Sequence, residues 1–278
     1  MKEKTIIIHS QVSYGYVGSN TTSFILKAAG YDAITIPTVL YSNHLGHRTV
    51  GGQPISDNLL KNILEGILKL NILHEVSTII TGFMGSVKQT EITANFIKTA
   101  QQKNPNIKHL CDPVMGDTDK GLYVHQSIPE AITKNLVPLA SLLTPNKFEL
   151  DLILKQNLTN IQENRPLLNS TFNLSEQKIV VTGCMFASTA TDEIDNYILE
   201  NNHCTSISGK KIALHPAGTG DLFTAHLQLS ILKGLNLPQA VSNASKALTA
   251  SLKNMALQKR TEFDLQDLLF SLQVIKNC

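Results

Sequence analysis

The sequence predicts an α/β fold in which a mostly parallel sheet is covered by helices on both faces. Short β-branched or apolar runs alternate with segments of helical periodicity, a pattern typical of such folds. Glycine, proline and polar residues gather just after the predicted strands, where open parallel sheets bind ligands. We expect one domain over residues 1–278, with a small β-meander at one edge of the sheet.

The first two thirds of the chain hold the alternating elements. Ser56 is an N-cap candidate, and the leucines and isoleucines after it recur at helical spacing, so a helix is expected there. Gly30 is placed to end the helix before it. In chain order the predictions are strand 5–9, helix 20–29, strand 33–37, helix 56–70, strand 76–80, helix 89–102, strand 107–111, strand 141–143, a helix from about 147, and strand 178–182.

The last third differs. Ranges 195–199, 205–207 and 211–214 are short apolar runs with no helix between them, which predicts the meander. Helices are expected over 221–233, 238–257 and 264–275, and Pro238 suits a first helical turn. The polar segment 155–177, interrupted by Pro166, leaves open whether a short helix lies there.

Composition excludes several classes of protein. With 42% hydrophobic and 17% charged residues the chain is not disordered, and a net charge of +2 is too balanced for a general nucleic-acid or membrane-surface binder. No apolar run is long enough to span a bilayer. The 4 cysteines are scattered without CxxC and are expected to be reduced thiols. Since residues 1–10 lack a signal-peptide core, a cytoplasmic location is expected.

The sharpest motif is Gly218-Thr219-Gly220-Asp221, which opens an apolar-faced helix. Glycines let the backbone approach a ligand, and a helix N-terminus favours anions, so a phosphoryl group in transit would meet backbone donors here. Asp221 would lie beside it, able to take a proton from an attacking hydroxyl group. The alternative is a tight turn in which Asp221 only caps the helix.

Two further motifs follow predicted strands. Asp112 and Asp117 flank a Pro–Gly turn and could hold a magnesium–phosphate group, although such turns are also common without a ligand. Asn146 and Glu149 have the spacing of a helix capping box, and in the functional alternative they lie at the metal–phosphate end of the site.

Other motifs are absent. The sequence has no GxxxxGK[ST], HRDxxxxN, HExxH or GxSxG, and no GxGxxG after the first strand, which argues against several other nucleotide-binding and hydrolytic classes. His44 and His47 lie in one loop with no third metal ligand near them in the sequence. We expect them to be ordinary loop or pocket residues.

Taken together, these loops resemble the ribokinase superfamily and, within it, the pyridoxal kinases. The resemblance covers most of the chain. The segments that carry it are SQVSYGYVGSN (10–20), TVLYSNHLGH (38–47), TGFMGS (81–86), CDPVMGD (111–117), TPNKFEL (144–150) and HPAGTGDLFTAHL (215–227).

The resemblance implies a ribokinase-like fold, usually a homodimer. It implies ATP-dependent phosphorylation of the 5′-hydroxymethyl group of pyridoxal in vitamin B6 salvage, with Mg²⁺ and a second, monovalent cation such as K⁺. Asp221 matches the catalytic base, and Gly218, Thr219 and Gly220 match the anion hole. The other matches are Asp112, Tyr123, Asn146, Glu149, Thr182 and Thr219 for ATP, Asp117, Thr144 and Glu149 for the cations, and Ser10, Leu45, Gly46, Phe83 and Asp221 for the substrate.

Three positions depart from the family's pattern. Leu45 stands where the family usually has a substrate-contacting Thr, Phe83 where it often has Tyr, and Ala217 replaces a larger apolar residue. The lost hydroxyl groups leave hydroxymethylpyrimidine, or another hydroxymethyl heterocycle, as an alternative substrate. A catalytically inactive ligand-binding protein on the same fold is the third hypothesis, against which the intact Gly218–Asp221 motif argues.

Overall fold

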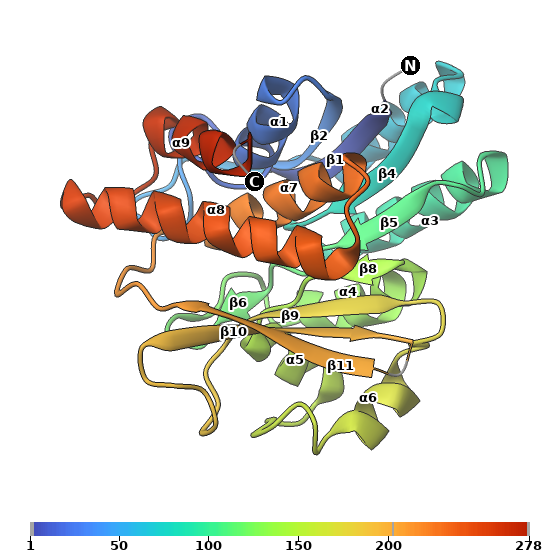
Figure 1. Ribbon diagram of the computed structural model, residues 1–278. Coiled ribbons are helices and arrows are strands. Elements are labelled where there is room, and N and C mark those ends of the chain that lie inside the picture. The colour runs from blue at the N-terminus through green and yellow to red at the C-terminus, as the bar shows by residue number, and fades with distance from the viewer. Residues whose placement is uncertain (1–2, 202, 277–278) are drawn as a thin grey trace.

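The computed structural model describes residues 3–201 and 203–276, and its strands form one large sheet (Figure 1). The strands of this sheet are β1 (Lys4–Val12), β2 (Asp32–Tyr41), β3 (Gly52–Pro54), β4 (Val76–Thr81), β5 (Lys108–Cys111), β8 (Leu142–Leu143), β9 (Lys178–Cys184), β10 (Glu193–Glu200) and β11 (His203–Lys210). Among the described residues the sheet has 9 strands in the order β11-β10-β9-β8-β5-β4-β1-β2-β3. Strands β9, β8, β5, β4, β1 and β2 pair in parallel, and antiparallel strands extend both edges. The predicted mostly parallel α/β sheet is confirmed.

Helices cover both faces of the sheet (Figure 1). They are α1 (Ser19–Ala28), α2 (Asp57–Lys69), α3 (Val87–Lys103), α4 (Ile128–Asn135), α5 (Lys147–Leu154), α6 (Arg165–Thr171), α7 (Thr219–Leu232), α8 (Leu237–Leu257) and α9 (Leu265–Lys276), with short 3₁₀ turns η1 (Leu73–Glu75) and η2 (Val137–Leu139). A separate hairpin, β6 (Gly116–Asp117) and β7 (Gly121–Leu122), follows β5.

The side chains of β1 explain the two helical layers. Successive side chains of a strand point to opposite faces, so Ile6 and Ile8 belong to one buried cluster and Ile7 to the other. The first cluster includes side chains of α2 and α3, and the second includes those of α1, α7 and α8. Because both faces are buried, the strand is a continuous apolar run rather than an alternating one.

The predicted elements agree with the structure within a few residues, with one exception. Range 211–214 was expected to be a third meander strand, and this prediction is wrong: the edge is a hairpin of β10 and β11 alone, paired from Glu193 with Lys210 to Glu200 with His203. Ile212 and Leu214 pack, partly buried, against the cluster beneath α7 and α8. Their hydrophobicity therefore reflects packing against helices and not strand pairing.

Several short elements carried no clear signal in the sequence. The structure adds β3, the β6–β7 hairpin and α4, and it extends β2 to Tyr41. The question left open for 155–177 is answered by α6, in whose first turn Pro166 lies. Ser56 caps α2 as predicted, since its side chain accepts a hydrogen bond from the Leu59 N–H.

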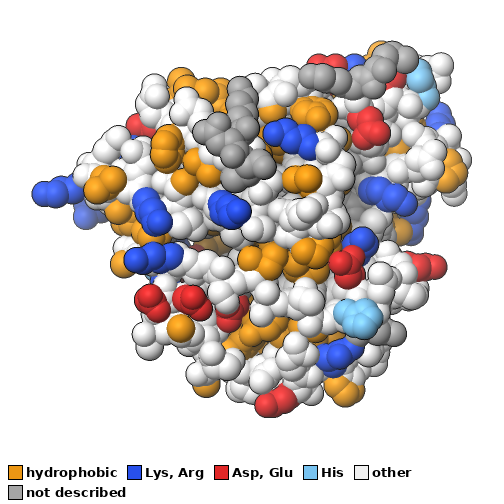
Figure 2. Space-filling view, in the orientation of Figure 1, with side chains coloured by type: hydrophobic (Ala, Val, Ile, Leu, Met, Phe, Trp, Pro, Cys, Tyr) orange, Lys and Arg blue, Asp and Glu red, His pale blue; other side chains and the backbone are white. Residues whose placement is uncertain are grey.

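The charges on the surface are mixed, and the described cysteines are unpaired. Figure 2 shows lysines, arginines and acidic side chains interspersed on one face of the molecule. No helix of the described chain is long and apolar enough to cross a membrane. Cys111, Cys184 and Cys204 are free thiols, and Cys278 lies outside the described residues.

Candidate active site

The turn 218–221 joins a tight backbone contact to a helix N-terminus. Gly218 has φ +91°, and a Cβ there would lie 2.4 Å from the Tyr16 carbonyl oxygen, so only glycine fits. Helix α7 begins at Thr219, and the first N–H groups of a helix have no acceptor within it. Gly220 is exposed in this first turn, and an anion at this helix N-terminus stays a prediction.

The Asp221 carboxylate is buried and held by two donors from distant parts of the chain. The Gly18 N–H donates to Oδ2 at 2.7 Å, and His9 Nε2 lies 3.0 Å from Oδ1. Burial alone would raise the pKa of Asp221, but the His9 ring and the Gly18 N–H outweigh it, and the net shift is downward. Asp221 is therefore held as a carboxylate, the form that a general base requires.

His9 is a residue of this site that the sequence reasoning missed. Its Nδ1 accepts the Ser10 backbone N–H at 2.8 Å, and because a neutral imidazole carries one proton, that proton is on Nε2, facing Asp221. Gly82 makes room for the ring, since a Cβ there would lie 1.9 Å from it. The signal in the sequence was a histidine at the end of a buried strand.

Asp112 lies next to the same helix. Thr224 Oγ1 donates to Asp112 Oδ2 at 2.7 Å, and the Thr144 and Thr224 hydroxyl oxygens are 3.3 Å apart. Burial, together with the charges of Glu149 and Asp221, raises the pKa of Asp112 to about 8. The structure thus brings three predicted site residues, Asp112, Thr144 and Asp221, to the start of α7.

Asn146 and Glu149 form the predicted capping box of α5. The Asn146 side chain accepts from the Glu149 N–H at 2.9 Å, and Glu149 Oε2 accepts from the Asn146 N–H at 2.9 Å. Glu149 Oε1 also accepts from the Met115 N–H at 2.8 Å, which fixes the turn after β5, where Val114 has a left-handed φ of 42°. Burial raises the pKa of Glu149 to about 7.

The β6–β7 hairpin and the residue after it carry Asp117, expected near a cation, and Tyr123, expected near ATP. Tyr123 donates its hydroxyl hydrogen bond to Asp117, whose other oxygen accepts the Lys120 N–H at 2.6 Å. The Asn146 side-chain amide donates to the Gly116 carbonyl at 2.8 Å and so ties the hairpin to α5. Thr182 forms an isolated parallel bridge with Asn146. Asp117 is thus bound within the hairpin and does not contact Asp112.

The residues expected to contact the substrate differ in exposure. Ser10 is buried, with its hydroxyl oxygen 3.1 Å from Nδ1 of His9, the histidine that pairs with Asp221. Phe83 is partly buried, and its carbonyl accepts a hydrogen bond from Thr38 Oγ1 at 2.6 Å. Leu45 and Gly46 are exposed in the loop after β2.

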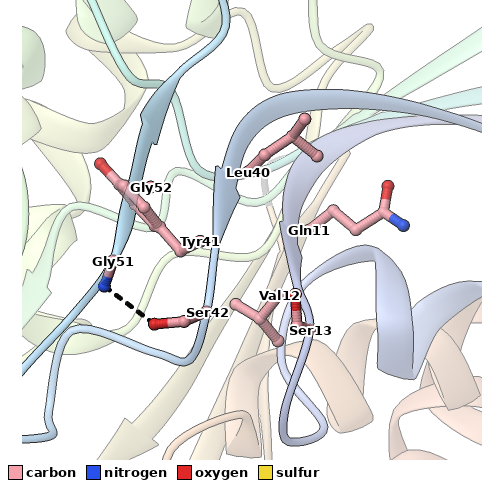
Figure 3. A pocket seen from close by; sticks show the side chains of 8 residues that line it. All are labelled: Gln11, Val12, Ser13, Leu40, Tyr41, Ser42, Gly51 and Gly52. Atoms are coloured by element: carbon pink, nitrogen blue, oxygen red, sulfur yellow. Dashed lines mark hydrogen bonds between the residues drawn. The ribbon is translucent and has the colours of Figure 1, made fainter.

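A hollow of about 430 Å³ borders this side of the site (Figure 3). It is lined by Gln11, Val12, Ser13, Leu40, Tyr41, Ser42, Gly51 and Gly52. The Gly51 N–H donates to Ser42 Oγ at 2.8 Å and closes the base of the loop that carries Leu45. Neither Ser10 nor Asp221 lines this hollow, so it is distinct from the buried pocket of polar groups around Asp221.

The acidic groups fit a divalent cation. Asp112, Glu149 and Asp221 are buried near one another, and the raised pKa values of Asp112 and Glu149 show that their negative charge is undercompensated. Oxygen ligands of this kind suit Mg²⁺, which keeps most of its waters and takes few protein ligands. Asp112 is the best candidate ligand because both oxygens of Glu149 already accept backbone N–H groups.

Comparisons with known proteins agree on the family. Residues 22–263 match the family model described as phosphomethylpyrimidine kinase. The chain is 30% identical to a pyridoxine/pyridoxal/pyridoxamine kinase of Bordetella avium over 89% of its own length and 83% of that protein. It is 33% identical to a pyridoxal kinase of Arabidopsis thaliana over 81% of this chain and 72% of the relative.

Solved structures share the fold. The crystal structure of pyridoxal kinase from Entamoeba histolytica is similar with a TM-score of 0.88 and 24% identity, covering 99% of this chain and 96% of that one. Pyridoxal kinase from Leishmania donovani in complex with ADP and pyridoxamine has a TM-score of 0.85 at 22% identity, over 99% and 96% of the two chains. These likenesses confirm the ribokinase-like fold that the resemblance implied.

Proposed function

This chain belongs to the phosphomethylpyrimidine kinase family, and from that premise we propose that it phosphorylates the 5′-hydroxymethyl group of pyridoxal with ATP. The products are pyridoxal 5′-phosphate and ADP. The single observation that carries the proposal is the buried Asp221 carboxylate, held by His9 and Gly18 beside the open N–H groups of α7. Relatives named as kinases of pyridoxal, pyridoxine and pyridoxamine support the substrate class.

In the proposed mechanism Asp221 accepts the proton of the substrate hydroxyl group as its oxygen attacks the γ-phosphorus of ATP. The new O–P bond forms while the bond to the ADP oxygen breaks, and ADP leaves with that electron pair. The N–H groups of Thr219, Gly220 and Asp221 stabilise the negative charge on the phosphoryl oxygens in the transition state. The lowered pKa of Asp221 keeps it unprotonated before the attack.

The cations are part of the proposal. We infer that Asp112, with Glu149 beside it, holds Mg²⁺ at the ATP phosphates and that Asp117 and Thr144 lie near K⁺. When bound, Mg²⁺ neutralises phosphate charge. The support is the buried acidic charge described above. Asn146, Thr182 and Tyr123 are proposed to contact ATP from α5, β9 and the β6–β7 hairpin.

The substrate contacts are proposed from the ends of β1, β2 and β4. Ser10 is proposed to bind the ring of the substrate, Phe83 to stack against it, and the segment at Leu45 and Gly46 to cover it. This arrangement is supported by Ser10, which is buried and contacts His9, the partner of Asp221. Leu45 supplies no hydroxyl donor, so we expect weaker polar recognition on that side.

We also propose that residues 1–278 are one kinase domain that works as a cytoplasmic homodimer. The continuous sheet from β3 to β11 supports one domain. The free Cys111, Cys184 and Cys204 support a reducing compartment. The exposed side chains of Tyr14 and of Leu40, which lines the hollow of Figure 3, support a subunit interface, and sedimentation or light scattering of the purified protein would test it.

A second candidate is phosphorylation of hydroxymethylpyrimidine. The description of the matching family favours it, as do the apolar Leu45 and Phe83, which carry no hydroxyl to select a vitamin B6 ring. An inactive binding protein is disfavoured, because binding alone does not require a base held ionised at 9% exposure.

The test measures ATP consumption with Mg²⁺ and K⁺ for pyridoxal, pyridoxine, pyridoxamine and hydroxymethylpyrimidine side by side. We expect the highest kcat/KM with pyridoxal, and the loss of most turnover in Asp221→Asn. A higher kcat/KM for hydroxymethylpyrimidine selects the second candidate. Turnover with none of the four substrates, while ATP still binds, would favour the inactive binding protein.

A further inference from the structure

Two side chains of the loop after β2 meet a third side chain from a distant segment. His44 and His47 come from the loop after β2, and Glu262 comes from the segment between α8 and α9. Their ligand atoms all lie within 4.8 Å of one another. The sequence showed no third ligand for the two histidines, and folding supplies one from more than two hundred residues away.

The two distances from Glu262 to the histidines are close to those between ligands of one metal ion. Glu262 Oε1 lies 3.0 Å from His47 Nε2 and 3.5 Å from His44 Nε2. Ligands of a tetrahedral Zn²⁺ with bonds of ~2.0–2.1 Å are about 3.3 Å apart, so the two distances bracket that value. The imidazole rings are tilted by 45° with their centroids 4.3 Å apart, and their ligand atoms converge with that of Glu262.

The hydrogen bonding of the cluster is incomplete. Among the described residues His44 Nε2 and His47 Nε2 are buried atoms without a hydrogen-bond partner, although a carboxylate oxygen lies close to each. A buried polar atom left unpaired destabilises the folded state, so two such nitrogens facing one carboxylate need an explanation. A cation bound between them would satisfy both.

We propose that His44 Nε2, His47 Nε2 and a Glu262 oxygen bind Zn²⁺, with water in the fourth position. Imidazole and carboxylate ligands in an open tetrahedral arrangement suit Zn²⁺, whereas Mg²⁺ prefers oxygen ligands. The site is thus separate in chemistry from the carboxylates proposed for Mg²⁺. It does not depend on the proposed function.

Zinc binding changes the loop that holds two of the ligands. The Gly46 N–H now donates to His44 Nδ1 at 3.1 Å, but a histidine that binds metal through Nε2 carries its proton on Nδ1. The Gly46 amide must therefore turn away, next to Leu45. The bound metal links this loop to the α8–α9 segment, so the conformation of residues 42–51 responds to zinc. The charge of Lys120 near His44 opposes the cation and keeps binding weaker than at a four-ligand structural site.

The test is a zinc titration of the full-length, chelator-treated protein in excess Mg²⁺, read by competition with a chromophoric chelator. We expect one Zn²⁺ per chain, and about tenfold or more weaker binding in His47→Ala and in Glu262→Gln. The matched control is His74→Ala. This variant removes an exposed histidine whose Nε2 lies 3.7 Å from a carboxylate oxygen of Glu75. Because no second histidine accompanies that pair among the described residues, the zinc affinity of the variant should equal that of the wild type.

Two outcomes would overturn the proposal. One is wild-type binding no tighter than in the double variant His47→Ala/Glu262→Gln, whose folding is checked by its melting temperature. The other is hydrogen exchange of residues 42–51 that zinc does not slow. Since neither readout involves phosphorylation, failure of this site is distinguishable from failure of the proposed kinase activity.

Discussion

Asp221 at the start of α7 and Asp112 just after β5 lie at the same edge of the sheet, but their electrostatic settings differ. Asp221 receives two donors, from His9 and Gly18, and its pKa is lowered. Asp112 receives one, from Thr224, and its burial near Glu149 and Asp221 raises its pKa to about 8. The protein's own donors compensate the charge of Asp221, whereas they leave the charge of Asp112 undercompensated.

The largest expected effect is the loss of the base. Asp221→Asn keeps the hydrogen-bond acceptor oxygen but cannot take a proton, so we expect kcat to fall by about 10²–10⁴-fold. ATP affinity should stay close to that of the wild type. Steady-state kinetics measure kcat, and a nucleotide titration measures the ATP affinity. An Asn variant with undiminished kcat contradicts the assignment of Asp221 as the base.

The next effect concerns what holds the base in place. His9→Leu removes the donor to Asp221 Oδ1, and a hydrogen bond to a charged group contributes about 1.5–3 kcal/mol, so we expect at least a tenfold lower kcat. The pKa of Asp221 should rise, which moves the acid limb of the kcat–pH profile to higher pH. His9→Gln retains an N–H donor and is the matched control. If His9→Leu and His9→Gln have the same pH profile, His9 fills space and does not position the base.

The raised pKa of Asp112 predicts how stability depends on pH without divalent cations. The unfolded carboxyl group ionises near pH 4 and the folded one near pH 8, so the folded state binds more protons between them. The free energy of unfolding should therefore fall as pH rises from 5 to 8. In Asp112→Asn the fall should be smaller by more than about 1 kcal/mol. Urea denaturation at both pH values measures it, with the exposed Asp119→Asn as control; equal falls in all three proteins would refute the prediction.

The smallest effect is on substrate affinity. Leu45→Thr restores a hydroxyl donor on the substrate side, and one hydrogen bond contributes about 1 kcal/mol, so KM for pyridoxal should fall about fivefold. The kcat value should change little, because Leu45 lies apart from Asp221. Kinetics with pyridoxal and hydroxymethylpyrimidine side by side measure the change, and a KM for pyridoxal that stays the same or rises contradicts this reading of the loop.

Local spacing predicted part of the site well. The Asn146–Glu149 capping box and the start of α7 at the 218–221 turn both depend on hydrogen bonds between residues three or four apart, so the sequence alone indicates them. The prediction of a strand at 211–214 was wrong, because the hydrophobicity of a segment does not distinguish pairing at a sheet edge from packing under a helix.

Long-range contacts could not be predicted in the same way. The Gly18 N–H reaches Asp221 across 203 residues, and Thr224 reaches Asp112 across 112. His9 had no recognisable role until folding placed it against Asp221, and the two loop histidines had no third ligand until folding brought Glu262 to them.

The sequence by itself determined the order of the longer strands and helices, the buried apolar runs and the motif that opens α7, because these depend on periodicity and on neighbours a few residues apart. Only the tertiary structure decided which carboxylate is held ionised and which is left short of donors. The ionisation of a buried group depends on desolvation and on donors brought from other strands, and no local pattern encodes those distances.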